Sequence, residues 1–328
     1  MKLKTFHIPI FVPHKGCPHD CVFCNQRKIT GITNEMTVIE ADEIIKNNLE
    51  TIEKYNSKGS YIAEIAFFGG SFTAIEMDRQ NELLSLANLY LKSGRVHGIR
   101  LSTRPDCIND EILSNCKNYG VTAIELGVQS ADEEVLKLSN RGHTFEDVKN
   151  ASCLIHKYEI ELGLQMMTGL PGDTYQKSVD TAKKIAGLNP KNVRIYPTLV
   201  MEGTHLFEMY REGKYIPQKL SEAVSLAADI AEIFISKNIE ILRISLQTTD
   251  GVNKDTVIGP YHPAFAELVY SEIEKRKLED YIIKNKLSSC ILSVKTDKPS
   301  QVIGHKKSNK LYFKEKYDID IKANCCLC

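Results

Sequence analysis

Three cysteines lie within eight positions near the start of the chain, in the segment GCPHDCVFCNQ (residues 16–26). Cys17, Cys21 and Cys24 have the spacing C-x3-C-x2-C, which lets one loop wrap its thiolates around a single metal centre. A structural zinc site and an ordinary electron-transfer iron–sulfur cluster each take four ligands. Three ligands leave one iron of a [4Fe-4S] cluster open for a substrate or cofactor. The alternative is a zinc loop that borrows a distant fourth ligand.

Alternating apolar segments predict the elements that hold this loop. Strands are expected at residues 5–12, 61–68, 96–103, 121–129, 160–168, 192–200 and 239–247, with helices at 37–55, 76–93, 110–119, 145–158, 174–188 and 220–237. Thr144 and Asp147 match a capping box at the start of the fourth helix. Strand–helix alternation at this spacing predicts parallel strands with crossover helices. The expected fold is α/β, a partial open (β/α)6-type barrel with a small basic C-terminal α/β extension.

Polar and glycine-containing motifs follow successive strands of this predicted barrel. They are the cysteine loop, Gly69-Gly70-Ser71, STRP (residues 102–105), GVQS (127–130) and MMTGLPG (166–172). The C-terminal ends of parallel barrel strands meet on one face, where such folds carry out their chemistry. We therefore expect these motifs to form one site.

The cysteine loop, with Phe23 before its third cysteine, resembles that of the radical S-adenosylmethionine (SAM) enzymes. The resemblance implies a [4Fe-4S] cluster on Cys17, Cys21 and Cys24, with SAM bound to its open iron. A reduced cluster would cleave SAM to methionine and a 5′-deoxyadenosyl radical, which takes a hydrogen atom from the substrate. The reductant would be a protein such as flavodoxin or ferredoxin.

The same resemblance implies which residues bind SAM. Gly69 and Gly70 match the segment whose backbone meets the methionyl amine, and Ser71 stands where the usual motif has an acid. By similarity to the oxygen-independent coproporphyrinogen oxidase branch, Gln129 and Arg141 would bind the ribose and the carboxylate. The remaining expected SAM contacts are Phe23, Ser102, Arg104 and Gln165, the last in place of a ribose-binding acid.

Residues 8–220 resemble more narrowly the radical SAM domain of the Elongator catalytic subunit. The matching stretches are STRPD, ELGVQSADEEVLKLSNRGHT, GLPGDT and VRIYPTLVMEGTHLFEMYREGKYIP. In that enzyme the domain works with an acetyltransferase domain to carboxymethylate wobble uridine of transfer RNA. About 110 residues follow the match here, so we expect neither an acetyltransferase domain nor the basic N-terminal extension. The resemblance implies a stand-alone Elongator-like protein.

The C-terminal part differs from the barrel in charge. We predict a barrel over residues 1–250 and an extension over 251–328, whose tail from Lys284 carries ten lysines and four acidic residues. Residues 295–323 resemble the core of a KH-type RNA-binding module, with Lys307 in place of the second loop glycine. RNA is the expected partner, and a basic cap over the barrel is the alternative. Tyr312 and Phe313 could stack on bases, although at least one should be core.

Candidates for the reaction itself are fewer. Tyr196 on the sixth strand, and Tyr261 and His262 on the loop GPYHPAF, are the predicted catalytic residues, because a tyrosine can relay a hydrogen atom and histidine a proton. Packing of the loop by its rings is the alternative for Tyr261 and His262. Polar residues that could also reach a substrate are Arg194, Arg243 and Gln247, while Glu125 is a further polar strand-end residue of the motif that contains Gln129.

Composition limits the remaining possibilities. Lysine plus arginine and aspartate plus glutamate number 42 each, so any nucleic-acid site must be local. We expect a cytoplasmic protein, since no segment has the length of a membrane span or the form of a signal peptide. Its ten cysteines are then reduced thiols. Cys116 and Cys153 are predicted in the core, and no role is predicted for Cys325, Cys326 and Cys328.

Three functions remain open at this stage. The first is radical SAM modification of RNA, most simply transfer RNA. The second is radical SAM chemistry on a small molecule, as in the coproporphyrinogen oxidase relatives. The third is a non-catalytic iron–sulfur or RNA-binding module that keeps the fold.

Overall fold

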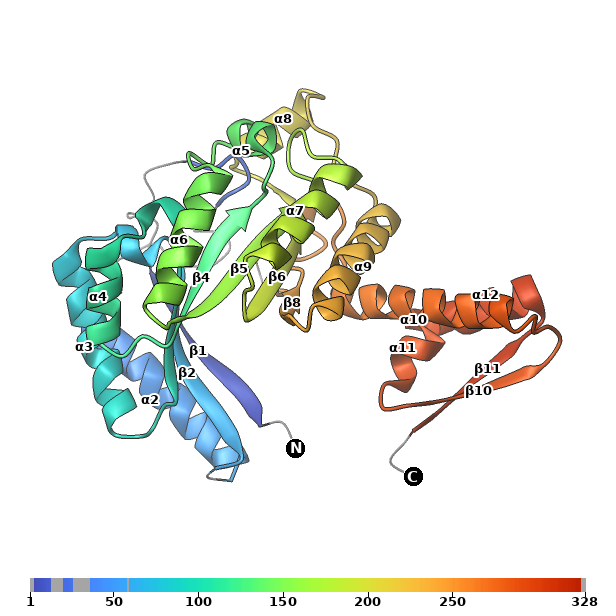
Figure 1. Ribbon diagram of the computed structural model, residues 1–328, viewed down its shortest axis with the longest axis horizontal. Coiled ribbons are helices and arrows are strands. Elements are labelled where there is room, and N and C mark those ends of the chain that lie inside the picture. The colour runs from blue at the N-terminus through green and yellow to red at the C-terminus, as the bar shows by residue number, and fades with distance from the viewer. Residues whose placement is uncertain (1–2, 13–19, 26–35, 58, 250, 326–328) are drawn as a thin grey trace.

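The computed structural model describes residues 3–12, 20–25, 36–57, 59–249 and 251–325. Seven strands form one curved sheet whose spatial order follows the chain (Figure 1). All neighbouring pairs are parallel. The strands are β1 (Lys4–Val12), β2 (Tyr61–Gly69), β3 (Gly98–Thr103), β4 (Ala123–Gln129), β5 (Glu161–Thr168), β6 (Asn192–Pro197) and β8 (Glu240–Ile244). Within the described chain β1 and β8 are not paired to each other, so the predicted open partial barrel is confirmed.

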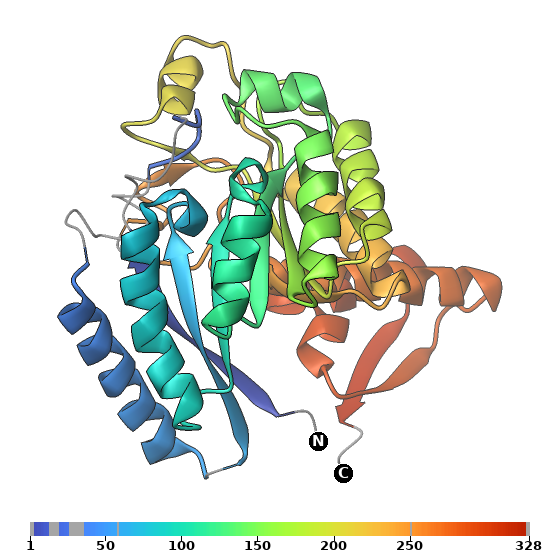
Figure 2. The same cartoon turned by 60° about the vertical axis from the view of Figure 1, so that its left-hand side comes forward.

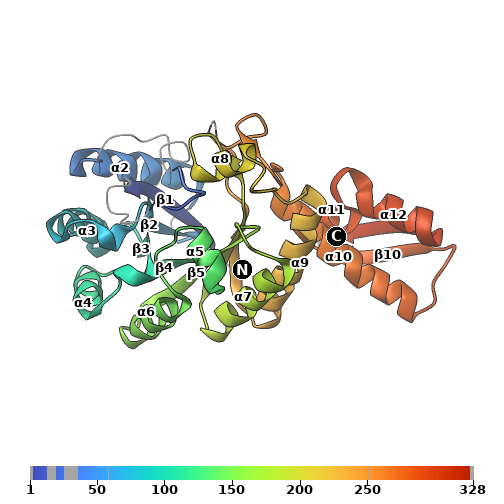
Figure 3. The same ribbon diagram turned by 90° about the horizontal axis from the view of Figure 1, so that it is seen from above.

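Helices cover the outer, convex face of the sheet (Figures 2 and 3). They are α2 (Val38–Tyr55), α3 (Met77–Lys92), α4 (Asp110–Asn118), α6 (Phe145–Lys157), α7 (Tyr175–Gly187) and α9 (Leu220–Ser236). Their apolar stripes and the outward residues of the strands make one large core. The expected capping box of α6 is confirmed: the side chains of Thr144 and Asp147 each accept a hydrogen bond from the other residue's backbone N–H.

Two short helices above the sheet were not predicted. They are α5 (Glu133–Leu138) and α8 (His205–Arg211), of 6 and 7 residues. Each follows a strand end directly, and each begins at a capping side chain, Asp132 or Thr204. Two turns are too short for a helical period to stand out in a sequence, yet both helices flank the cysteine loop.

The prediction for the two helical cysteines is half right. Cys116 on α4 is fully buried, and burial raises the pKa of its thiol to about 12. Cys153 on α6 is exposed, so its expected place in the core is wrong. The stripe of α6 that packs inward is formed by Val148, Ala151 and Ile155, and Cys153 lies off this stripe.

The C-terminal extension has a small apolar core of its own and lies to one side of the barrel (Figure 1). Its elements are α10 (Phe265–Lys284), β10 (Ile291–Thr296), α11 (Pro299–Ile303), α12 (Ser308–Tyr317) and β11 (Asp320–Cys325), with β10 and β11 parallel. Helix α10 joins the two cores, since Phe265 packs in the barrel and Ile282 in the extension. Phe313 is fully buried, whereas Tyr312 donates a hydrogen bond to Glu279. The predicted boundary at residue 250 stays a prediction.

No helix within the described ranges is long and apolar enough to cross a membrane.

Helix α3 offers a matched test of the core. Leu84 is fully buried beneath the sheet, whereas Leu89 on the same helix is 66% exposed. We expect Leu84→Ala to lower the free energy of unfolding by about 2–5 kcal/mol, because it leaves a cavity in a close-packed core. Leu89→Ala should change it by less than about 0.5 kcal/mol. Urea unfolding measures both, and similar losses in the two variants would contradict this packing.

Candidate active site

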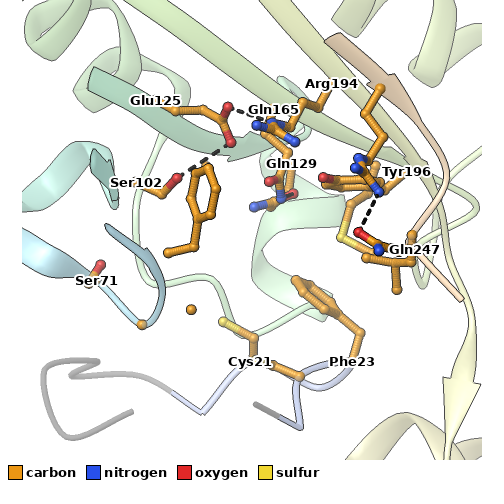
Figure 4. A pocket seen from close by; sticks show the side chains of 18 of the residues that line it. Cys21, Phe23, Ser71, Ser102, Glu125, Gln129, Gln165, Arg194, Tyr196 and Gln247 are labelled. Carbon is orange, nitrogen blue, oxygen red and sulfur yellow. Dashed lines mark hydrogen bonds and ion pairs between the residues drawn. The ribbon is translucent and has the colours of Figure 1, made fainter. Parts of the chain in front are cut away.

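A cavity of about 430 Å³ opens at the C-terminal ends of the strands (Figure 4). It brings together most of the residues that the sequence singled out. From the predicted set, the cavity is lined by Cys21, Phe23, Cys24, Gly69, Gly70, Ser71, Ser102, Arg104, Gln129, Arg141, Gln165 and Tyr196. Cys17 lies outside the described residues. Motifs that are far apart in the sequence therefore share one cavity, as the parallel topology predicts.

The described part of the cysteine loop is held by the two short helices. Val22 donates its backbone N–H to the carbonyl of Ser139, directly after α5, at 3.2 Å. The N–H of Leu206, in the first turn of α8, donates to the carbonyl of Val22 at 2.7 Å. Within the loop the N–H of Cys24 donates to the carbonyl of Cys21 at 3.0 Å. These bonds fix the backbone on which two of the thiols are carried.

Arg141 links the cysteine loop to the sheet. Its Nη1 lies 3.2 Å from the Sγ of Cys21, and its Nη2 donates to the carbonyl of Gly127 at 2.7 Å. This contact fixes the position of the Cys21 thiol relative to the end of β4. The Nε of Arg141 is buried and has no partner among the described residues. The residue thus retains a donor beside the cysteines.

Arg104 and Ser71 support this arrangement from neighbouring strand ends. The Arg104 guanidinium donates to the carboxylate of Asp106 and to the carbonyl of Arg141. The hydroxyl of Ser71 accepts from the backbone N–H of Arg104 at 3.1 Å. Burial opposes the charged guanidinium, but Asp106 outweighs it and raises the pKa of Arg104. Both residues line the cavity, and these bonds hold the loops of its wall.

The glycine pair and the two glutamines form the adjoining wall. Gly69 has φ +100, and a Cβ there would lie 3.0 Å from the carbonyl oxygen of Val12, so only glycine fits. Gln129 has φ +65 at a bulge in β4. This bulge turns Gln129 toward β5, where its Oε1 accepts from the Nε2 of Gln165 at 3.2 Å. The side-chain amides of the two predicted SAM-binding glutamines therefore hold each other in place.

On the far side of the cavity from Cys21 in Figure 4 lies a buried ion pair, Glu125 with Arg194. The Nε of Arg194 donates to the Oε2 of Glu125 at 2.6 Å. Burial opposes the charge, but the carboxylate keeps the pKa of Arg194 above its usual value. Tyr196 lies beside them, and burial raises the pKa of its hydroxyl. The Nη1 of Arg243 reaches the Oε1 of Gln247 at 3.3 Å.

Tyr261 and His262 do not line this cavity. The Tyr261 hydroxyl shares a 2.8 Å hydrogen bond with that of Thr248, and its ring packs behind Leu199 and Val252. His262 lies against the extension, with its ring centroid 5.0 Å from that of His305. These contacts match the packing alternative, and the catalytic roles of the two residues stay predictions.

Sequence reasoning missed His143 and Phe68. Phe68 lines the cavity as the last aromatic residue of an apolar strand, where nothing in the sequence distinguishes it. His143 is buried behind Arg141, and its imidazole contacts the carbonyl of Val128. Burial and then the charges of Arg141 and Arg104 lower the pKa of His143 to about 3. A histidine two residues after an arginine carries no such signal in the sequence.

Comparison with known families agrees with this geometry. Residues 11–185 match the model of the Radical SAM superfamily, and residues 190–275 match that of the Radical_SAM C-terminal domain. The chain belongs to the radical SAM superfamily. Since the first match covers more than half of the chain and includes the whole cysteine loop, the chain is a radical SAM enzyme.

Several relatives of this radical SAM enzyme are known. An uncharacterized protein of Methanocaldococcus jannaschii is 32% identical over 74% of this chain and 76% of its own. The tRNA uridine(34) acetyltransferase of Methanocaldococcus infernus is 28% identical over 80% of this chain and 55% of its own. The chain thus spans about half the length of the tRNA uridine(34) acetyltransferases that it matches.

Solved structures share the fold. Archaeal Methanocaldococcus infernus Elp3 lacking residues 1–46 superposes with a TM-score of 0.65 at 23% identity, covering 84% of this chain and 64% of that chain. Escherichia coli coproporphyrinogen III oxidase superposes with a TM-score of 0.50 at 16% identity, covering 72% of this chain and 53% of that chain. At these identities the likeness concerns the fold alone, and it confirms the partial barrel of the radical SAM type.

Membership of the superfamily implies a [4Fe-4S] cluster and SAM. The cavity fits both groups. It offers the thiols of Cys21 and Cys24, the first of them beside a guanidinium. It also offers a buried Arg141 nitrogen without a hydrogen-bond partner in the described chain, and the backbone at Gly69, where no Cβ fits. A guanidinium suits the carboxylate of an amino acid, and bare backbone suits its amine.

The pKa of His143 predicts a pH dependence of stability. The folded protein keeps this imidazole neutral down to about pH 3, whereas in the unfolded chain it takes up a proton below about pH 6.5. Stability should therefore fall as the pH drops below 6.5, by up to about 1.4 kcal/mol per pH unit from this residue. The free energy of unfolding in urea should be measured at pH 7 and at pH 5 for both proteins. Its decrease between the two pH values should be about 2 kcal/mol smaller in His143→Gln than in the wild type. Equal losses would contradict the buried neutral imidazole.

Proposed function

We propose that this radical SAM enzyme modifies transfer RNA, and that its target is a uridine. The observation that carries the proposal is the exposed basic loop Gly304–Lys307 in the extension, which contacts the loop next to the cavity wall through His262 and His305. The relatives named tRNA uridine(34) acetyltransferase, which align with four fifths of this chain, give the base and the RNA class. Acetyl transfer is not part of the proposal, since the chain spans about half of their length.

In this proposal Cys17, Cys21 and Cys24 would hold the cluster, and Arg141 holds the thiol of Cys21 in place. Together the cluster and SAM supply a one-electron cleavage that yields methionine and an organic radical able to take a hydrogen atom from the substrate. The chain positions SAM through the backbone of Gly69-Gly70, Arg141, and the Gln129–Gln165 pair, with Ser102 nearby. The electron comes from an external carrier of the flavodoxin or ferredoxin class.

The basic loop has the properties of a phosphate-binding segment. Lys306 and Lys307 are exposed, and neither forms an ion pair in the described part of the chain. Both have left-handed φ values, +51° and +65°. Gly304 is required, because a Cβ there would lie 2.5 Å from Ser308 Oγ and 2.8 Å from Asn309 N. A tight loop with unpaired lysines before a helix favours the backbone of a nucleic acid.

His262 connects this basic loop to the segment beside the cavity, as a neutral imidazole. Burial, and next the neighbouring His305 and Lys306, lower the pKa of His262. Tyr261, the preceding residue, packs against Val252 and Leu199, both of which line the cavity. An RNA strand held at the basic loop would therefore have a short path to the cavity mouth.

The radical chemistry is tested by the formation of 5′-deoxyadenosine. After anaerobic reconstitution with iron and sulfide, dithionite reduction and addition of SAM, we expect the wild type to release 5′-deoxyadenosine and Cys24→Ala to release only background amounts. Cys153→Ser, which changes an exposed thiol on α6, is the matched control and should equal the wild type. Bulk transfer RNA should raise the yield. A fully loaded cluster without 5′-deoxyadenosine would favour the non-catalytic alternative.

The RNA proposal is tested on the two unpaired lysines. We expect Lys306→Ala/Lys307→Ala to weaken transfer RNA binding about tenfold at physiological salt, and to reduce the slope of log K against log salt by about 1–2, because each lysine releases counterions from a phosphate. The control, Lys149→Ala/Lys183→Ala, removes two lysines that are ion-paired on α6 and α7. Filter binding across salt concentrations measures both. Unchanged binding in the first variant would exclude this loop as the RNA-binding site, whereas no transfer RNA binding by the wild type would favour a small-molecule substrate.

A further inference from the structure

The Glu125–Arg194 pair crosses the interior of the barrel from β4 to β6 and faces the cavity (Figure 4). Isolated charges are costly to bury, so the two groups must be in place together. Arg194 is only 8% exposed and Glu125 3%. No predicted SAM-binding residue forms an ion pair with either of them, and the pair is separated from Cys21 by the width of the cavity in Figure 4.

In this ion pair one donor of Arg194 has no hydrogen-bond partner in the described chain, and one acceptor of Glu125 has only a weak one. The Nη2 of Arg194 is buried and has no hydrogen-bond partner among the described residues. The Oε1 of Glu125 has only a long contact, 3.5 Å from the hydroxyl of Ser102, while Oε2 accepts from Arg194. A buried donor without a partner is uncommon in folded proteins and calls for a ligand or a water. Here it adjoins a carboxylate oxygen that can accept another bond.

A flat apolar surface lies beside these two groups. The guanidinium of Arg194 lies over the ring of Phe68, 5.3 Å from its centroid. Phe68 lines the cavity together with Phe11 and Tyr196. Aromatic faces of this kind stack on nucleobases without selecting among them, so the choice of base falls to the hydrogen-bonding groups at the edge.

We propose that Glu125 and Arg194 bind the imide edge of a uracil base. The N3–H of uracil would donate to Glu125 Oε1, and the adjacent carbonyl would accept from Arg194 Nη2. The inference rests on the proposed function, because it needs a nucleobase in the cavity. It adds the two residues that would hold this edge of the base.

Cytosine and adenine each carry an amino group beside a ring nitrogen that accepts, so the pair by itself does not reject them, whereas N3-methyluracil lacks the ring donor altogether. The lactam edge of guanine has the same donor and acceptor order as uracil, so guanine must be tested beside it. A site built to hydrogen-bond its substrate rejects an analogue that leaves buried groups unpaired. We therefore expect discrimination of about tenfold or more against a base that lacks the N–H.

The experiment measures binding to the cluster-loaded protein in the presence of SAM and without reductant, so that no turnover is needed. The probes are short single-stranded RNAs of one sequence, fluorescently labelled, with a single central uridine, cytidine, N3-methyluridine or guanosine. The N3-methyl group removes the donor and leaves both carbonyls and the ring. Tight binding of the uridine probe is the expected result, with N3-methyluridine at least about tenfold weaker and with neither cytidine nor guanosine bound more tightly than uridine.

Variants then assign the preference to the pair. Glu125→Gln replaces the carboxylate by an amide of the same shape, and the preference for uridine over N3-methyluridine should fall to within about twofold. Glu125→Gln/Arg194→Gln removes both charges at once, which avoids a lone buried charge. Glu161→Gln is the matched control, since Glu161 also pairs with a barrel arginine, Arg100, but does not line the cavity. It should retain the wild-type preference.

The outcomes separate this inference from the proposed function. Equal binding of the four probes by the wild type overturns the imide assignment and leaves RNA as the substrate class. Preference for guanosine over uridine also overturns it. Binding of none of the probes, and of no transfer RNA, overturns both. A uridine preference that survives in both Glu125 variants shows that other residues select the base, and overturns the assignment to this pair.

Discussion

The guanidinium of Arg141 is the interaction on which the cavity depends. It joins the thiol of Cys21, carried by a loop, to the carbonyl of Gly127, carried by the sheet. The backbone carbonyl of Arg141 is in turn held by Arg104. A metal site is only as well placed as the groups that orient its ligands. Here one side chain sets the position of a thiol, and the strand ends set the position of that side chain.

The cost of this arrangement is a concentration of positive charge in the interior. Arg104, Arg141 and Arg194 are all nearly buried at the same end of the barrel. Two of them have carboxylate partners, Asp106 and Glu125. Arg141 has none in the described chain and instead faces a thiol. The neighbouring His143 stays neutral, because burial and next the charges of Arg141 and Arg104 lower its pKa to about 3. Anionic groups, whether thiolates or the carboxylate of SAM, are the natural complement of this field.

Much of this could be predicted from the sequence, for identifiable reasons. Strands buried on both faces give continuous apolar runs, and the runs at residues 61–68 and 121–129 became β2 and β4. Parallel topology then forces their ends together, so Gly69 and Gln129 could be assigned to one site from the chain alone. The spacing of the cysteines by itself is compatible with either an iron–sulfur cluster or a zinc ion. The resemblance of the cysteine loop to a known family predicted the cluster.

What could not be predicted depends on contacts between distant segments. Helices α5 and α8 have too few turns to show a period, and their function is to bond the backbone at Val22. Tyr261 packs with Leu199 outside the cavity lining, and a loop sequence carries no signal for which way such a ring packs. The pairing of Glu125 with Arg194 joins positions 69 residues apart.

One helix and one loop connect the barrel to the C-terminal extension. Helix α10 belongs to both cores, so the extension is carried on the barrel by continuous secondary structure. The segment before it, which holds Tyr261 and His262, contacts the cavity wall at one end and the basic loop at the other. An RNA strand bound at Lys306 would approach a cavity whose lining is itself rich in arginine. The positive charge at the surface would then bind the phosphate backbone of the RNA. The uncharged edge of a base would form its hydrogen bonds inside the cavity, where hydrogen bonds are strongest.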